Sequence, residues 1–144
     1  MTEVSPTQIL YPVFAMVLLV AIVLMRMRSL RFAAVRNRDV SVEYYRAFHG
    51  ETEPEPLRVV ARHFSNLFEM PVLFYVVVLM IYTTRQVTWW LVACGWAYVA
   101  LRYVHSWIHL TSNVVMVRFT VYFASGFVLF AMWVGLLVRL LRAG

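Results

Sequence analysis

The first side chains that could do chemistry together are Arg62, Asn66 and Glu69, at the start of an apolar stretch. They are spaced i, i+4 and i+7, so a continuous helix would carry all three on one face. Charged groups within an apolar helix cost about 2.5–3.5 kcal/mol each on membrane-insertion scales and therefore mark candidate functional sites. The set offers a cation, an amide and a carboxylate to one ligand.

A second group, Arg102, His105 and His109, lies at the polar end of a later apolar stretch. Its spacing of i, i+3 and i+7 again defines one helical face. Arg118 follows at the start of the next apolar run, with Tyr122 one turn later on the same side. We expect these helix ends to meet on one side of a helical bundle, which would bring both groups into one layer.

The chemistry of such a layer follows from its charges. Arg62, Arg102 and Arg118 outnumber the single carboxylate of Glu69. An excess of arginine suits an anion with more than one carboxylate, because guanidinium groups form bidentate contacts. An arginine beside a thiol also lowers the thiol pKa from about 8.5 and favours the thiolate. Glutathione carries two carboxylates, an ammonium and a thiol, so it matches this set.

A structural interpretation of the same residues stays open. Glu69 can neutralise Arg62 or Arg102 between helices, which would make the charged cluster a means of holding the bundle together. The protein would then be a non-enzymatic membrane protein that binds lipid or a partner.

The histidines allow a third interpretation. His105 and His109, at i and i+4, can bind a metal ion, with Glu69 as a further ligand. The neighbouring arginines would repel a cation, so we predict no metal ligand here. We assign no role to His63 or His49.

The composition points to lipid as the main solvent. Hydrophobic residues make up 62% of the 144 residues and charged residues 14%, against about 25% charged in soluble domains. All the basic residues are arginine, and most lie in one stretch after the first apolar run, so the net charge of +6 fits membrane topology better than nucleic-acid binding. The single cysteine, Cys94, excludes an intrachain disulfide framework.

The apolar runs that must position the site predict an all-α, integral membrane four-helix bundle within a single domain of residues 1–144. A spanning helix needs roughly 17–25 residues, and Arg26 and Arg28 are expected to end the first one. Pro71 should bend the second. We predict helices over 8–26, 57–83, 87–110 and 115–141.

Topology follows from counting arginines. The loop predicted after the first helix holds seven, whereas the turn after the second holds one and the C-terminal tail two. Cytoplasmic loops carry the excess of basic residues. We therefore expect the arginine-rich loop in the cytoplasm and both termini on the opposite side, in a bacterial inner membrane.

Residues 62–71, with the sequence RHFSNLFEMP, resemble the Arg-x3-Asn-x2-Glu signature of the MAPEG family, the membrane-associated proteins in eicosanoid and glutathione metabolism. Arg102-x2-His105-x3-His109, followed by Arg118 and Tyr122, is similar to the Arg-x2-His-x3-Tyr and Arg-x3-Tyr arrangement of its microsomal glutathione transferase and prostaglandin E synthase branch. The resemblance covers nearly the whole chain.

The resemblance implies a homotrimer in the membrane that binds glutathione as co-substrate between subunits. Arg118 would be the catalytic residue that stabilises the thiolate, and a small lipophilic electrophile would enter from the bilayer. The implied activity is that of a glutathione-dependent transferase or peroxidase. The glutathione-binding residues would be Arg62, Asn66, Glu69, Arg102, His105, His109 and Tyr122.

Three departures from the family pattern bear on the reaction. Met70 occupies a position where several members carry Tyr, His109 replaces a Tyr expected to touch glutathione, and Phe119 leaves no hydroxyl beside Arg118. These changes argue against the eicosanoid activities more than against generic transferase or peroxidase chemistry.

Overall fold

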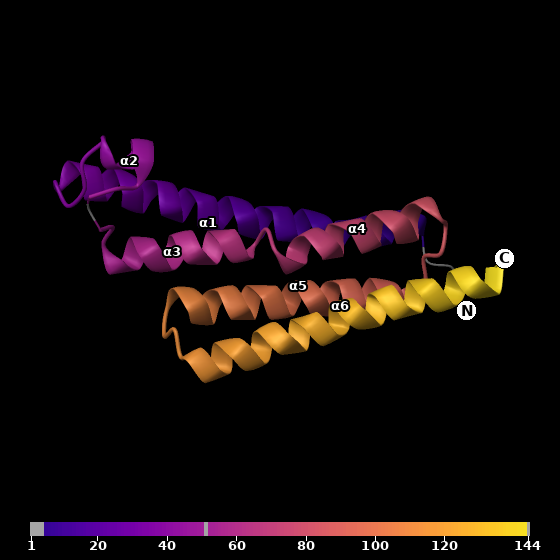
Figure 1. Ribbon diagram of the computed structural model, residues 1–144. Helices are drawn as coiled ribbons and strands as arrows, with labels where there is room; N and C mark the ends of the chain where they lie inside the picture. The colour runs from indigo at the N-terminus through magenta and orange to yellow at the C-terminus, as the bar shows by residue number, and fades with distance from the viewer. Residues whose placement is uncertain (1–4, 51, 144) are drawn as a thin grey trace.

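The computed structural model describes residues 5–50 and 52–143, and all the regular structure in them is helical. A short 3-10 helix, η1, leads into the first long helix, and a four-residue helix, α2, lies in the loop that follows it (Figure 1). The helices are η1 Pro6–Leu10, α1 Tyr11–Arg36, α2 Tyr44–Ala47, α3 Glu55–Asn66, α4 Met70–Thr83, α5 Trp89–Leu110 and α6 Val115–Ala143.

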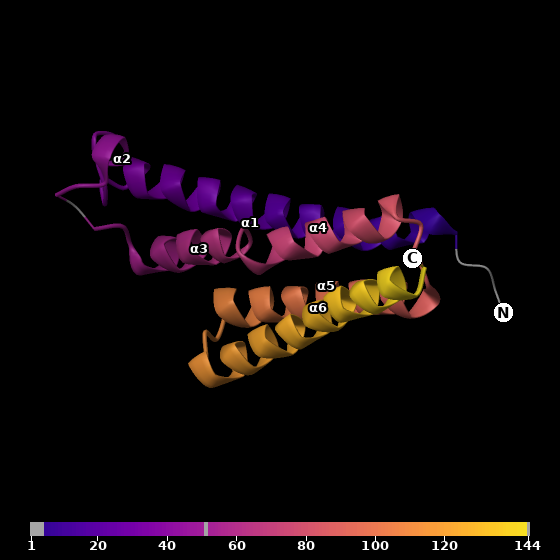
Figure 2. The same cartoon turned by 45° about the vertical axis from the view of Figure 1, so that its right-hand side comes forward.

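The long helices run back and forth as an elongated antiparallel bundle (Figures 1 and 2). α1 lies beside α3 and α4, which together form the second pass, and α5 packs along α6. The described chain therefore begins and ends at the same end of the bundle, and the loop with α2 lies at the other. The predicted all-α four-helix arrangement is confirmed.

The first helix is longer than predicted. It does not end at Arg26 but continues to Arg36. Arginine is a good helix former, so the charges end the apolar part without ending the helix. Met27 and Ala34, two turns apart, stay buried, and the helix packs against α3. The helix ends where Arg38 adopts a left-handed backbone with φ of 62°.

The second predicted helix is interrupted at residues 67–69. Proline has no N–H, and its ring clashes with the carbonyl four residues back, which disrupts the helix before Pro71. Glu69 departs from helical geometry with φ of −94° and ψ of −99°. Pro71 was expected to bend the helix, and the observed break is stronger than a bend. Arg62 and Asn66 lie in α3, but Glu69 lies beyond its end. The three residues therefore do not share one helical face, contrary to the prediction.

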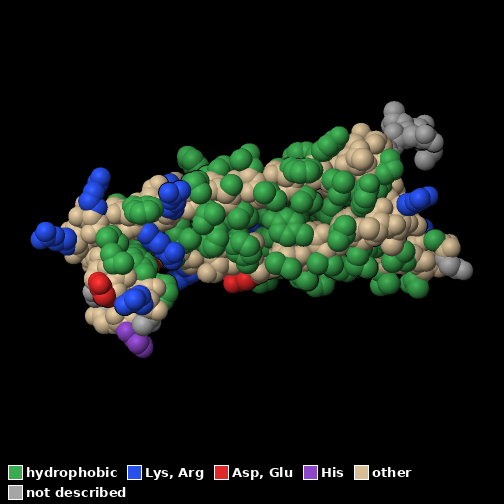
Figure 3. All heavy atoms as spheres, turned by 90° about the horizontal axis from the view of Figure 1, so that it is seen from above, with side chains coloured by type: hydrophobic (Ala, Val, Ile, Leu, Met, Phe, Trp, Pro, Cys, Tyr) green, Lys and Arg blue, Asp and Glu red, His purple; other side chains and the backbone are tan. Residues whose placement is uncertain are grey.

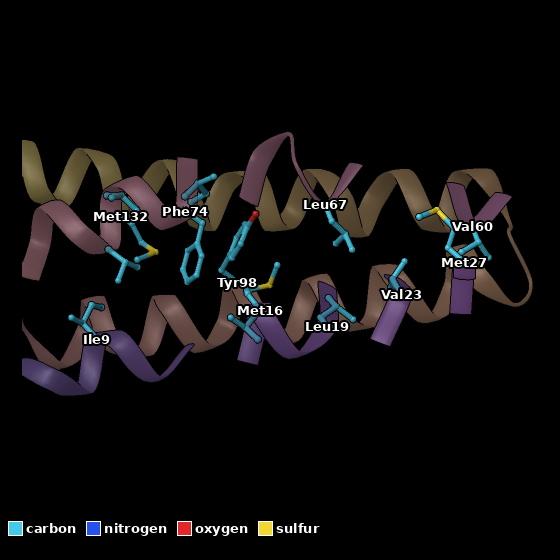
Figure 4. Close-up of a cluster of buried hydrophobic side chains, with 14 of the residues drawn as sticks. Ile9, Met16, Leu19, Val23, Met27, Val60, Leu67, Phe74, Tyr98 and Met132 are labelled. Carbon is cyan, nitrogen blue, oxygen red and sulfur yellow. The ribbon is translucent and has the colours of Figure 1, made fainter. Parts of the chain in front are cut away.

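A continuous apolar core runs along the bundle axis. Figure 4 shows Met16 of the first pass beside Phe74 and Tyr98 of the later ones, with Val23 further along the axis toward Val60. The rings of Phe74 and Tyr98 stack with centroids 4.6 Å apart and an interplanar angle of 20°. This stacking links α4 to α5.

The outer surface suits a bilayer. Hydrophobic side chains cover the middle of the face seen in Figure 3, with arginines toward both ends. Among the described residues, three helical stretches are long and apolar enough to cross a membrane: Pro6–Arg36, Glu55–Thr83 and Val115–Ala143. The fourth predicted span, α5, is not one of them. Its 22 residues reach about 33 Å, but its C-terminal half is polar.

Candidate functional site

Three helices converge on a small pocket of about 170 Å³. Asn66 ends α3, His105 lies in α5, and Arg118 and Tyr122 lie in the first two turns of α6. Val115 and Phe119 complete the lining. Four of the eight predicted site residues thus line one pocket.

Arg118 is held by the turn that leads into α6. Its Nη1 donates a 2.5 Å hydrogen bond to Oδ1 of Asn113, which adopts a left-handed backbone with φ of 48°. Its carbonyl oxygen lies 3.3 Å from Nδ1 of His105, and that ring nitrogen donates because a carbonyl can only accept. His105 therefore fixes the backbone of Arg118, which lines the pocket.

Arg102 lies beside the pocket and is fully buried. Its Nη2 donates to the carbonyl of Asn66 at 3.2 Å, and its Cζ lies 5.4 Å from the ring centroid of Tyr122. Its Nε and Nη1 have no hydrogen-bond partner. A buried guanidinium without a carboxylate is costly, so this side chain is poised to receive an anion.

Arg62 and Glu69 lie outside this pocket, and both are exposed. Neither forms an ion pair within 4.0 Å in the described part of the chain, where Arg31 and Glu53 make the one such contact. The interhelical salt bridge that the structural interpretation requires is therefore not formed there. Both side chains are free to meet a ligand or a second subunit.

His109 also lies outside this pocket. It contacts a second pocket of about 260 Å³ at the loop end of the bundle, together with Arg26, Glu55 and Asn113. Its ring packs edge-on against that of His63, with centroids 4.8 Å apart. Sequence reasoning had grouped His109 with His105 by spacing alone.

His63 is a buried polar residue to which the sequence analysis assigns no role. It is fully buried, and its Nδ1 and Nε2 contact His109 and Ser106 at 3.0 and 2.9 Å. A signal was present in the sequence: Leu57, Val60 and Leu67 define the core face of the α3 pass, and His63 shares it.

An apolar groove on α6 adjoins the pocket. It encloses about 180 Å³ and is lined by Met70, Tyr122, Phe123, Gly126, Phe127 and Phe130. Tyr122 belongs to both the groove and the polar pocket. Phe127 and Phe130 are exposed, so the groove opens on the apolar outer surface.

Comparison with known proteins agrees with this architecture. Neither the curated proteins nor the solved structures include a significant match to the chain. The profile of the MAPEG family matches residues 9–138, a span that covers α1 to α5, most of α6 and every residue of the pocket. The chain is thus an integral membrane protein that belongs to the MAPEG family.

Proposed function

We propose that the protein is a glutathione-dependent membrane transferase or peroxidase that acts on lipophilic electrophiles. Membership of the MAPEG family is consistent with a glutathione-related role in the membrane. The observation that carries the proposal is the convergence of Asn66, Arg118 and Tyr122 on one pocket, beside the buried and incompletely paired Arg102.

In this proposal the ligand completes the charges of the site. A carboxylate of glutathione accepts from the free nitrogens of Arg102 or from Arg62, because charge-assisted hydrogen bonds to guanidinium are strong and directional. Glu69 accepts from the ligand ammonium. Asn66 offers its side-chain amide to the ligand. Its backbone carbonyl, at the end of α3, already accepts a hydrogen bond from Arg102.

Arg118 would perform the chemical activation. Its guanidinium stabilises the thiolate, whose proton passes to water, and the sulfur then attacks the electrophilic atom. In a transfer, the carbon–sulfur bond forms as the leaving group departs with its electron pair. In a peroxidase reaction, sulfur attacks oxygen, the O–O bond breaks to release an alcohol, and a second thiol converts the sulfenic acid to a disulfide and water.

The electrophile would lie in the apolar groove on α6. A lipophilic molecule dissolved in the bilayer reaches Phe127 and Phe130 without crossing water. Tyr122 separates it from the polar pocket of about 170 Å³, which would hold glutathione and is called the thiol pocket below. Holding both reactants next to each other supplies much of the rate acceleration that positioning can give.

The size of the pocket favours a site between subunits. Ligand pockets usually enclose about 300–1,000 Å³, whereas the polar pocket of one chain holds about 170 Å³. Glutathione therefore needs a second wall, and the exposed Arg62 and Glu69 can contribute to it. A homotrimer would supply that wall from a neighbouring copy.

We also propose the orientation in a bacterial inner membrane. Three arginines lie at the loop end of the bundle. Arg36 ends α1, Arg38 follows it by two residues, and Arg46 lies in α2. The positive-inside rule then places this loop, and with it the end of the bundle that carries the thiol pocket, toward the cytoplasm, where low-molecular-weight thiols are kept reduced.

Calorimetric titration of glutathione into the detergent-purified protein tests the proposal. We expect saturable binding that weakens in Glu69→Gln and a thiolate absorption band that needs Arg118. Absence of heat at millimolar glutathione in folded protein would contradict it.

A further inference from the structure

Three histidines form a buried cluster between α3 and α5. The side chains of His63, His105 and His109 are at most 2% exposed. One ring nitrogen from each lies within 4.8 Å of a ring nitrogen from both others. The ring centroids of His63 and His105 are 5.7 Å apart, and those of His105 and His109 are separated by the same distance.

Hydrogen bonds fix which nitrogens of His63 can act as ligands. Ser106 donates its hydroxyl to the carbonyl of Arg102 at 2.8 Å. Its oxygen therefore accepts from Nε2 of His63 at 2.9 Å. In a neutral imidazole the other nitrogen is an acceptor, so Nδ1 of His63 presents a lone pair to Nδ1 of His109, 3.0 Å away.

A hydrogen bond also fixes which nitrogen of His105 can act as a ligand. Its Nδ1 donates to the carbonyl of Arg118, so Nε2 carries a lone pair in the neutral ring. That Nε2 is buried and has no hydrogen-bond partner. A ring whose second nitrogen donates to a carbonyl or hydroxyl is the usual form of a metal-bound histidine, and both His63 and His105 have it.

We propose that His63, His105 and His109 bind a zinc ion. Tetrahedral ligands at about 2.05 Å from Zn²⁺ lie about 3.3 Å from one another. The 3.0 Å between the Nδ1 atoms of His63 and His109 is close to that value, so the ion replaces the proton shared by these two rings. The third ligand is a ring nitrogen of His105. The three ligand atoms lie within 4.8 Å of one another, so a rotation of the His105 side chain brings that nitrogen to the ion.

The cluster has an access path and a free fourth position. His109 contacts the 260 Å³ pocket at the loop end, which reaches Arg26 and Glu55. Since Ser106 is occupied by His63 and the Arg102 carbonyl, water or an exogenous ligand entering from this pocket completes the coordination. The site shares His105 with the thiol pocket, but zinc binding itself does not depend on the proposed activity.

Positive charge nearby decides which ion binds. Arg62, Arg102 and Arg118 all oppose a cation here, although the carbonyl of Asn66 and the ring of Tyr122 compensate part of the charge of Arg102. The ion must therefore bind imidazole strongly. Mg²⁺ and Ca²⁺ require oxygen ligands, whereas imidazole suits Zn²⁺.

The test is the zinc content of tag-free, full-length protein in detergent. The protein is loaded with zinc sulfate, dialysed against a weak chelator and analysed by elemental analysis, and tetrahedral Co²⁺ absorption reports the geometry. We expect one equivalent per chain in wild type and in His49→Gln, which alters an exposed histidine outside the cluster. His63→Gln should lose the metal, and Ser106→Ala, which keeps all three ligands, should lower affinity about 10–100-fold.

A folded wild-type chain that retains no zinc, or a His63→Gln variant that retains as much as wild type, would overturn the proposal. The cluster would then be a metal-free hydrogen-bonded triad. If His63→Gln does not fold, Ser106→Ala decides between the two, because the triad gives no reason for its zinc affinity to differ from that of wild type.

Discussion

Nη2 of Arg102 donates to the carbonyl oxygen of Asn66 at 3.2 Å, across the space between α5 and the end of α3. In an unbroken helix that carbonyl would accept from the N–H of Met70. The break before Pro71 frees it, and a buried arginine takes the place of the backbone donor. Pro71 and Arg102 therefore act together: the proline frees the carbonyl of Asn66, and the arginine binds it and fixes Asn66 at the pocket.

Restoring the helix should weaken ligand binding. Pro71→Ala removes the clash with the Leu67 carbonyl, so the N–H of Met70 competes for the Asn66 carbonyl. We expect about tenfold weaker glutathione binding, or ~1.4 kcal/mol, measured by titration calorimetry. Amide exchange at residues 68–70 should slow. Pro56→Ala, in the first turn of α3, is the matched control, and equal effects of both substitutions would argue against this joint role of Pro71 and Arg102.

Removing the thiolate partner should abolish activation. Arg118→Met is expected to eliminate the thiolate absorption band of bound glutathione and to lower turnover with a model electrophile by about 10²–10³-fold, the usual effect of losing one stabiliser of a reacting anion. Arg142→Met alters an exposed arginine at the far end of α6 and should behave as wild type. Undiminished turnover in Arg118→Met would refute the mechanism.

The contact between α5 and α6 depends on a glycine. A Cβ at Gly135 would lie 1.9 Å from Cη2 of Trp90, so the indole packs directly on the α6 backbone. Gly135→Ala should lower stability by about 1–3 kcal/mol, as overpacking generally does, and the thermal midpoint in detergent reports it. Trp90→Leu in the same chain should recover most of the loss. A double variant no more stable than Gly135→Ala would contradict this account.

The proposed orientation can be tested by labelling. With Cys94 replaced by Ser, a single cysteine at Arg38 should react with a membrane-impermeant maleimide only after the cytoplasmic side is opened. A cysteine at Thr84, in the turn at the opposite end, should react in intact cells that have a permeable outer membrane. The reverse pattern would place the thiol pocket outside the cytoplasm.

The helices themselves could be predicted from the sequence because apolar runs dominate it. Their ends could not always be, since arginine both closes an apolar run and continues a helix. Arg26 thus ended the first predicted helix ten residues before its observed end at Arg36. Met27 and Ala34 lie beyond Arg26 and are buried within the helix, and their burial is a tertiary effect that the apolar run does not reveal.

The candidate site was predicted in part for a related reason. Asn66, His105, Arg118 and Tyr122 converge as expected because they lie near helix ends on one side of the bundle. Glu69 does not, since the spacing argument assumed one helical phase through Pro71. His63 was overlooked because a buried polar residue on a core face has no distinctive spacing of its own.

The interruption at residues 67–69 has a further consequence for how such a chain can diverge. Because α3 and α4 do not share one continuous winding, the rotational phase of the lipid-facing half is independent of the phase of the pocket half. Residues can be lost from or added to α4 to match a thinner or thicker bilayer without turning Asn66 away from its partners. Chemistry and membrane fit can thus be selected separately within one pass.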